Sequence, residues 1–239
     1  MTPARPDAST VRVYRGRRAT READRAATRE LVEQVGETEV PAIRVWRPGR
    51  QVAFGRRDTR ADGYAEARAA AEDQGFPPVE RSVGGRAVAY AETTLAFAHA
   101  VPTDGTRQGL DERYERAVET VTNALRECGA AVEAGEPAAA YCPGDYSVSA
   151  VEGGKIAGIA QRVRQDAALV AGSVTVAERA AIREVLVPVY DALGVEFDAE
   201  SVGSVAAAGG PDDPKAVRST LEDALVGDRE RALRDVTAL

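Results

Sequence analysis

Residues 141–162, with the sequence YCPGDYSVSAVEGGKIAGIAQR, decide how the middle of this chain folds. Two β-prone runs flank Gly153 and Gly154, and this pattern predicts that the chain turns back at the glycines to form antiparallel strands. The turn would bring Lys155, which starts the second run, near Cys142, which lies in a loop before a turn-forming Pro-Gly pair. A loop cysteine near a lysine is a candidate reactive centre.

Lysine is scarce in this chain, since only Lys155 and Lys215 are lysines among 31 basic residues. Arginine is always charged and fork-shaped, so a site that needs one compact ammonium on a slim stem cannot use it. An ammonium beside Cys142 would favour its thiolate, which is the nucleophilic form. The alternatives are a solvated surface charge for Lys155 and a small buried hydrophobic side chain for Cys142. Those simpler roles fit Lys215 and Cys128.

Apolar residues recur at helical spacing in several other segments. The helices expected from this spacing cover residues 21–37, 62–75, 109–129 and 177–194. Residues 41–55 should form a β-hairpin around Pro48 and Gly49, residues 76–102 a meander of strands, and the three β-prone runs within 146–176 should pair antiparallel. Strands joined by hairpins and covered by helices indicate an α+β fold with mixed, largely antiparallel sheets.

The composition changes near residue 194. Residues 201–214, with the sequence SVGSVAAAGGPDDP, resemble a flexible linker, and two short helical patterns follow at 215–226 and 228–239. We therefore expect one main domain over residues 1–194, with residues 195–239 as a linker and a small helical appendage.

The composition also argues against several classes of function. A formal net charge of −7 is unfavourable for nucleic-acid binding, which needs an excess of basic residues. No apolar stretch approaches the roughly 20 residues of a membrane span. Residues 1–18 lack the apolar core of a secretory signal, so the cytoplasm is the expected compartment. With His99 as the one histidine and two cysteines, neither a metal site nor a disulfide is expected. We interpret His99 as structural.

The segment RSVGGRAVAY, at 81–90, contains a second candidate site. It has neither the G-x-G-x-x-G pattern of a dinucleotide site nor the G-x-x-x-x-G-K pattern of a phosphate loop. Gly84 and Gly85 would let the backbone approach a ligand closely, with Arg81 and Arg86 adding positive charge for a carboxylate or phosphate. Taken alone, the glycine pair more often marks an ordinary tight turn between strands.

Together these segments resemble the lipoate-protein ligase and octanoyltransferase family, which is related to biotin-protein ligases. RSVGGRAVAY is similar to the family's R-x-S-G-G-x-A-V loop, and GGKIAGIAQRV to its G-K-K-x-A-G-x-S-Q strand. The preceding YCPGDYS resembles the C-P-G-x-Y-D-L-S of amidotransferases that move octanoyl groups between lipoyl-domain proteins. The resemblance covers residues 40–180 and implies a biotin/lipoate ligase-like α+β catalytic domain.

The resemblance also implies roles for individual residues. Cys142 would carry the acyl group as a thioester and pass it to a lysine of a lipoyl-domain protein, while Lys155 would contact the acyl carbonyl or assist proton transfer. The implied substrate-binding residues are Arg81, Ser82, Gly84, Gly85, Arg86, Gly158 and Gln161. Tyr90 stands where many members have histidine, and Ala160 replaces the usual serine or threonine.

Two other activities stay open beside this transferase, which needs no cofactor. An ATP-dependent lipoate-protein ligase would form an acyl-adenylate with ATP and Mg²⁺, and it would need Lys155 but not Cys142. A non-catalytic acyl-binding protein of the same fold would hold the acyl group without turnover. The partners that the resemblance implies are the glycine cleavage H protein and the E2 subunits of 2-oxoacid dehydrogenases, with an octanoyl or lipoyl group from a donor that the sequence leaves open.

Overall fold

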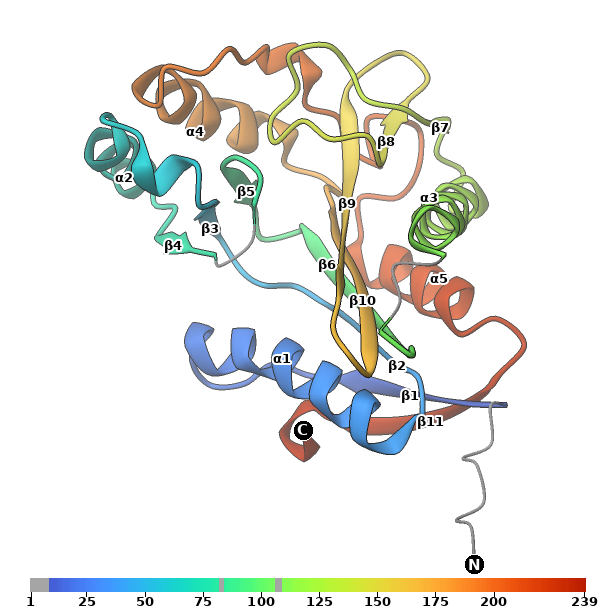
Figure 1. The fold of residues 1–239 in the computed structure, drawn as a ribbon. Helices are drawn as coiled ribbons and strands as arrows, with labels where there is room; N and C mark the ends of the chain where they lie inside the picture. The colour runs from blue at the N-terminus through green and yellow to red at the C-terminus, as the bar shows by residue number, and fades with distance from the viewer. Residues whose placement is uncertain (1–8, 82–83, 106–108) are drawn as a thin grey trace, which may run out of the picture.

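The computed structural model describes residues 9–81, 84–105 and 109–239, which form two β-sheets covered by helices (Figure 1). In spatial order, the larger sheet contains β11 (Glu230–Asp235), β1 (Thr10–Arg15), β2 (Ala42–Trp46), β6 (Leu95–Pro102), β10 (Ala167–Val174), β9 (Lys155–Val163), β8 (Ser147–Ala150) and β7 (Val132–Ala134). The smaller sheet contains β4 (Pro78–Glu80), β3 (Gln51–Phe54) and β5 (Val88–Tyr90). Both sheets mix parallel and antiparallel pairs, and this confirms the predicted α+β class.

The predicted antiparallel strands around the glycine pair are confirmed. β8 pairs with β9 and β9 pairs with β10, both antiparallel. The turn between β8 and β9 places Gly153 at φ +99° and Gly154 at φ +94°, in the left-handed region that glycine adopts without strain. Lys155 is therefore fixed at the first position of β9, directly after the turn.

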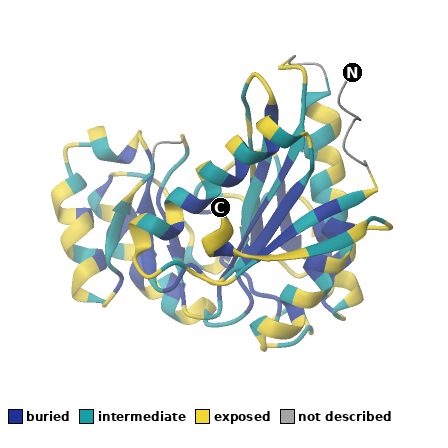
Figure 2. Ribbon diagram, turned by 90° about the horizontal axis from the view of Figure 1, so that it is seen from below, coloured by how far each residue is buried: buried dark blue, intermediate teal, exposed yellow. Residues whose placement is uncertain are grey.

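Helices cover both faces of the larger sheet (Figure 1). The five α-helices of the described residues are α1 (Arg21–Thr38), α2 (Tyr64–Asp73), α3 (Leu110–Glu127), α4 (Arg179–Ala192) and α5 (Pro214–Val226). Short 3-10 turns lie at Asp58–Arg60, Ala199–Ser201 and Val236–Ala238. α1 packs Leu31 and Val35 against Ala42 and Ala100 on one face. α3 and α5 cover the other face, where alternate residues of the same strands point. Figure 2 shows buried strands between helices whose outer turns are exposed.

The smaller sheet corrects two expectations. β2 and β3 do not form the predicted hairpin, because both edges of β2 are already occupied by β1 and β6. β3 instead pairs parallel with β4 and antiparallel with β5, so the predicted meander at 76–102 is also wrong. α2 and α4 pack on this sheet around Phe54. The smaller sheet, α2 and α4 therefore share a second hydrophobic core.

The C-terminal residues join the same structure. The predicted helix at 228–239 is wrong, because β11 pairs parallel with β1 along its whole length, from Thr10 opposite Glu230 to Arg15 opposite Asp235. This pairing satisfies backbone groups that would otherwise be left at the sheet edge. α5 buries Val217 and Leu221 in the core of the larger sheet, so part of 195–239 packs with it. In the described part of the chain, no helix is long and apolar enough to cross a membrane.

Candidate active site

A pocket of about 590 Å³ is lined by α1, strands of both sheets and the loop that carries Cys142. Its apolar lining side chains include Val32, Trp46, Phe97, Ile159 and Leu169. A concave, mainly apolar pocket of several hundred Å³ with a few polar groups is the usual form of a small-molecule site. The walls suit a hydrocarbon chain, and Cys142 lines the pocket together with Arg81 and Lys155.

Cys142 lies in the loop between β7 and β8 and lines the pocket. Its φ is +43°, a left-handed conformation that costs a residue with a side chain about 1–2 kcal/mol. The Cys142 N–H donates to the Tyr190 hydroxyl oxygen at 2.7 Å, and that hydroxyl donates to the Ala87 carbonyl at 2.9 Å. The surrounding structure therefore holds this cysteine in an unusual backbone conformation, which is common at functional sites.

The cation that contacts the sulfur is Arg81. Its guanidinium donates to Cys142 Sγ at 3.3 Å and also hydrogen-bonds to the Arg86 carbonyl. Burial alone would lower the pKa of Arg81, but the interactions of its guanidinium with the neighbouring Cys142 and Tyr90 side chains outweigh burial and raise that pKa. Arg81 thus remains a permanent positive charge beside the thiol.

Lys155 contacts the other side of the same residue. Its ammonium donates to the Cys142 carbonyl at 2.9 Å, to the Tyr141 carbonyl at 3.3 Å and to Glu136 Oε1 at 2.8 Å. Only 2% of Lys155 is exposed, and the three bonds use all three of its N–H donors. The hairpin therefore brings Lys155 to Cys142 as predicted, but it binds the backbone carbonyl, whereas Arg81 binds the sulfur.

The glycine pair lies against the thiol. Gly85 has φ +89°, and a Cβ added there would lie 2.8 Å from Cys142 Sγ and 3.0 Å from the Arg81 guanidinium. A side chain at this position would displace the reactive groups. Gly84 lines the pocket with open space around it, and Ser82 lies outside the described residues.

The other predicted site residues differ in whether they line the pocket. Arg86 does not line the pocket and forms an ion pair with buried Asp58 at 3.3 Å, which anchors the glycine loop. Gly158 lines the pocket, and its absent side chain leaves room for Lys155, whose Cε would lie 3.2 Å from an added Cβ. Gln161 also lines the pocket, but its amide is held by α3 through the Leu110 carbonyl at 3.0 Å.

Several site residues could not be identified from the sequence. Glu136 pairs with Lys155 from 19 residues away, and no motif marks it. Tyr190 reaches Cys142 from α4, whose helical spacing gives no sign of this role. Burial raises the pKa of both Tyr190 and Tyr141, so both hydroxyls stay neutral at ordinary pH. The Tyr190 hydroxyl can therefore accept from Cys142 and donate to Ala87 at once.

Comparison with known proteins identifies the family to which the chain is similar. The family model of the lipoyl protein ligase A/B catalytic domain matches residues 22–205, which are 184 of the chain's 239 residues.

Two similar curated proteins are octanoyl-[GcvH]:protein N-octanoyltransferases. That of Bacillus velezensis is 35% identical over 133 residues, covering 55% of this chain and 46% of that protein. That of Geobacillus kaustophilus is 33% identical over 120 residues, covering 50% of this chain and 42% of that protein. The chain spans about half the length of the curated relatives it matches.

Solved structures share the fold. A lipoate-protein ligase A bound with ATP has a TM-score of 0.75 at 18% identity, covering 95% of this chain and 88% of that one. A bi-partite lipoate protein ligase from Thermoplasma acidophilum has a TM-score of 0.68 at 19% identity, covering 95% and 86%. Because the family model covers most of the chain and these folds agree with it, the chain belongs to the lipoyl protein ligase A/B catalytic domain family.

Proposed function

We propose that this chain moves an octanoyl or lipoyl group, through a thioester on Cys142, to a lysine of a lipoyl-domain protein, and that it does so in the cytoplasm. The observation that carries the proposal is the position of the Cys142 sulfur, which lines an apolar pocket 3.3 Å from the Arg81 guanidinium. The names of the curated relatives support octanoyl as the group and GcvH as the donor. We include E2 lipoyl domains among the proposed acceptors, because the Thermoplasma ligase was studied with its E2 lipoyl domain.

In the first half-reaction, the Cys142 thiolate attacks the carbonyl carbon of the acyl-lysine amide on the donor. The carbon–nitrogen bond breaks, and the leaving lysine nitrogen takes up the proton that the thiol has lost. Arg81 stabilises the negative charge on the sulfur before the attack. The products are a Cys142 thioester and a free lysine on the donor.

In the second half-reaction, the neutral amine of an acceptor lysine attacks the thioester carbon. The carbon–sulfur bond breaks, the sulfur leaves as a thiolate beside Arg81, and the amine gives its surplus proton to solvent. A new amide forms on the acceptor, and Cys142 returns to its starting state. The overall reaction breaks one acyl-lysine amide and forms another, so its free-energy change is small and no energy-rich cofactor is required.

Lys155 fixes the loop that presents the thiol, since it binds the carbonyls of Tyr141 and Cys142 together. All three of its N–H donors are in use, so contact with an acyl carbonyl oxygen requires one bond to be exchanged. The bond to the Tyr141 carbonyl is the longest, at 3.3 Å, and is the one that we expect to be released. The ammonium would then offset charge on the carbonyl oxygen in the tetrahedral state.

The ligase alternative fits the residues less well. The arginines of the pocket could bind the phosphates of ATP. Among the described lining residues, however, the only carboxylate is Asp24, which is buried in an ion pair with Arg44. Mg²⁺ is usually held by one or two protein carboxylates together with substrate phosphates. The pocket therefore offers no free carboxylate for Mg²⁺ among these residues, and this supports the transferase.

The decisive experiment incubates the purified chain either with octanoyl-GcvH without ATP or with free lipoate and ATP, and follows the intact mass, AMP release and acyl transfer to an acceptor domain. We expect one octanoyl mass on Cys142 without ATP, and its loss in Cys142→Ala and Lys155→Ala. Cys128→Ala is the matched control, because Cys128 ends α3 outside the pocket lining. Activity of Cys142→Ala with ATP and AMP release would establish the ligase instead. Retention of the acyl group without transfer would establish an acyl-binding protein.

A further inference from the structure

The pocket is strongly basic although the whole chain is acidic. Its described lining contains seven basic side chains and one carboxylate, which sum to a formal charge of +6, whereas the chain carries −7. The basic side chains are Arg21, Arg25, Arg29, Arg81, Lys155, Arg162 and Arg164. Arg81 and Lys155 serve Cys142, as described above. The five other arginines, which we call the arginine rim, have no role in that chemistry.

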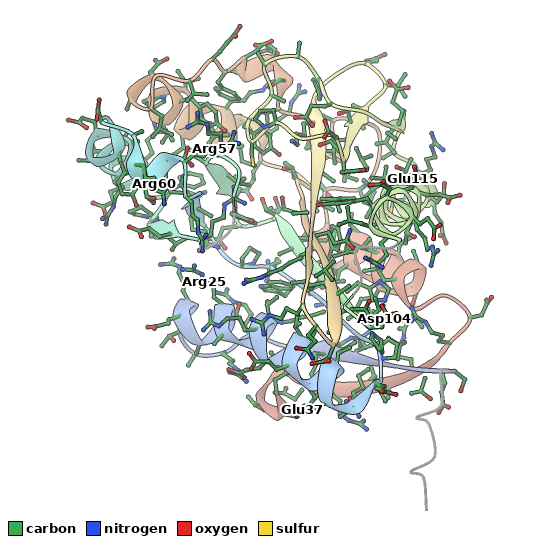
Figure 3. The ribbon with its side chains drawn as sticks, viewed as in Figure 1. Arg25, Glu37, Arg57, Arg60, Asp104 and Glu115 are labelled. Atoms are coloured by element: carbon green, nitrogen blue, oxygen red, sulfur yellow. The ribbon has the colours of Figure 1, made fainter. Side chains whose placement is uncertain are left out.

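The arginine rim comes from two neighbouring elements. Arg21, Arg25 and Arg29 follow one another at intervals of four on α1, so they share one face of the helix. Arg162 and Arg164 lie at the end of β9 and just beyond it. An ion pair of 3.1 Å between Arg164 and Glu33 joins this end to α1. In Figure 3, Arg25 extends from α1 toward the small sheet, where it hydrogen-bonds to the Glu80 carbonyl.

The rim's charge is not neutralised by the chain itself. Arg29 and Arg162 are exposed and form no ion pair or side-chain hydrogen bond within the described part of the chain. Arg21 and Arg25 donate only to backbone carbonyls there, so Arg164 alone has a carboxylate partner. Two acidic residues of α1 are engaged elsewhere, since Asp24 pairs with Arg44 and Glu30 with Arg18. Apart from Arg164, the arginine rim therefore has no ion-paired carboxylate among the described residues.

The spread of the rim indicates the kind of partner. Eight residues separate Arg21 from Arg29, which is about 12 Å along a helix, so a single carboxylate or phosphate cannot reach all three α1 arginines. Several anions fixed on one surface can. The proposed reaction supplies such a surface, because the acyl group enters the pocket attached to a protein lysine.

We propose that the arginine rim docks an acidic face of the carrier protein beside its acylated lysine. This inference rests on the proposed function and adds the surface that recognises the partner. Exposed charges around an interface act mainly on the rate of encounter and its salt dependence. The rim should therefore set how fast a protein donor binds, and it should matter less for a small donor without carboxylates.

The test compares the full chain with the variant R29E/R162E, which changes two rim arginines that lose no ion pair. The matched control is R116E/R234E, because both of those arginines are exposed and lie outside the pocket lining. Second-order rate constants for Cys142 thioester formation are measured with octanoyl-GcvH and with a small octanoyl thioester. The affinity for unacylated GcvH is measured separately, by titration at about 20 mM and 500 mM salt.

At low salt we expect R29E/R162E to lose at least tenfold more rate with octanoyl-GcvH than with the small thioester, and to bind unacylated GcvH at least tenfold more weakly. High salt should shrink both differences, since a Debye length of about 3 Å at 1 M salt screens exposed charges. Docking is overturned if R29E/R162E binds unacylated GcvH as tightly as the wild type does, or if the wild type shows no binding at low salt. Equal rate losses with both donors overturn it too. If the wild type binds GcvH through the rim but forms no thioester with either donor, the proposed function fails and the docking surface stands.

Discussion

Glu136→Gln is the sharpest test of how Lys155 is held. Glu136 is the one carboxylate paired with Lys155 in the described chain, at 2.8 Å, and Lys155 is 2% exposed. Glutamine keeps the size and one acceptor but removes the charge. The remaining bond still comes from the ammonium, so what is lost is the added strength of the second charge, about half of the 1.5–3 kcal/mol that a hydrogen bond to a charged group contributes. We therefore expect the free energy of unfolding to fall by about 1–2 kcal/mol.

The effect on chemistry should be larger than the effect on stability. An ammonium held less firmly by Gln at position 136 fixes the carbonyls of Tyr141 and Cys142 less precisely, so the thiol is less well positioned in the pocket. A misplacement of about 1 Å at a reactive group can cost about 100-fold in rate. We expect thioester formation by Glu136→Gln to fall by about 10–100-fold, with the Michaelis constant for the donor little changed.

The assays are urea unfolding and the single-turnover rate of thioester formation, applied to Glu136→Gln, Lys155→Met and the double variant. A double-mutant cycle should give a coupling of about 1 kcal/mol or more, because each partner acts through the other. Glu136→Gln with both stability and rate within twofold of the wild type would refute the reasoning. So would additive losses in the double variant.

Two further predictions concern His99 and the glycine loop. Burial lowers the pKa of His99 to about 4 from 6.5. Between these two pH values the unfolded chain binds more protons than the folded chain, so acid favours unfolding. The contribution of His99 to the free energy of unfolding should therefore be complete above pH 6.5 and decrease by at most about 3 kcal/mol on acidification. His99→Gln should flatten that slope in urea unfolding at pH 4 to 7, and an unchanged slope would assign it to other groups. Gly85→Ala should slow thioester formation by about 100-fold, because its Cβ would lie 2.8 Å from Cys142 Sγ at a φ of +89°. Gly84→Ala, whose Cβ meets no atom within 4 Å, is the matched comparison and should lose far less.

Local patterns were enough to predict most elements but not their pairing. The apolar spacing of α1 and α3 and the glycines between β8 and β9 are properties of neighbouring residues, so the sequence reveals them. The hairpin at 41–55 failed because β1 and β6 compete for β2, and that competition involves distant segments. β11 consists largely of good helix formers, such as Arg231 and Leu233, yet the open edge of β1 outweighs their preference.

The site shows the same division between local and distant information. The hairpin that places Lys155 against Cys142 spans 13 residues and could be predicted. The contact between Arg81 and Cys142 spans 61 residues and crosses between the two sheets. Only the complete fold brings these two together, so the sequence assigned the cation at the sulfur to the wrong residue.

The two cations of the site explain why the chain keeps a lysine at position 155 while using arginine nearly everywhere else. At the sulfur, the Arg81 guanidinium donates to Cys142 Sγ and also to the Arg86 carbonyl, and it remains charged. An arginine therefore suits this position. At Lys155, three acceptors converge on one nitrogen, and the stem passes within 3.2 Å of the Cβ that Gly158 lacks. A planar guanidinium spreads its five donors over three nitrogens and cannot aim three of them from one atom. The geometry therefore requires lysine at this position, independently of any direct contact between its ammonium and the sulfur.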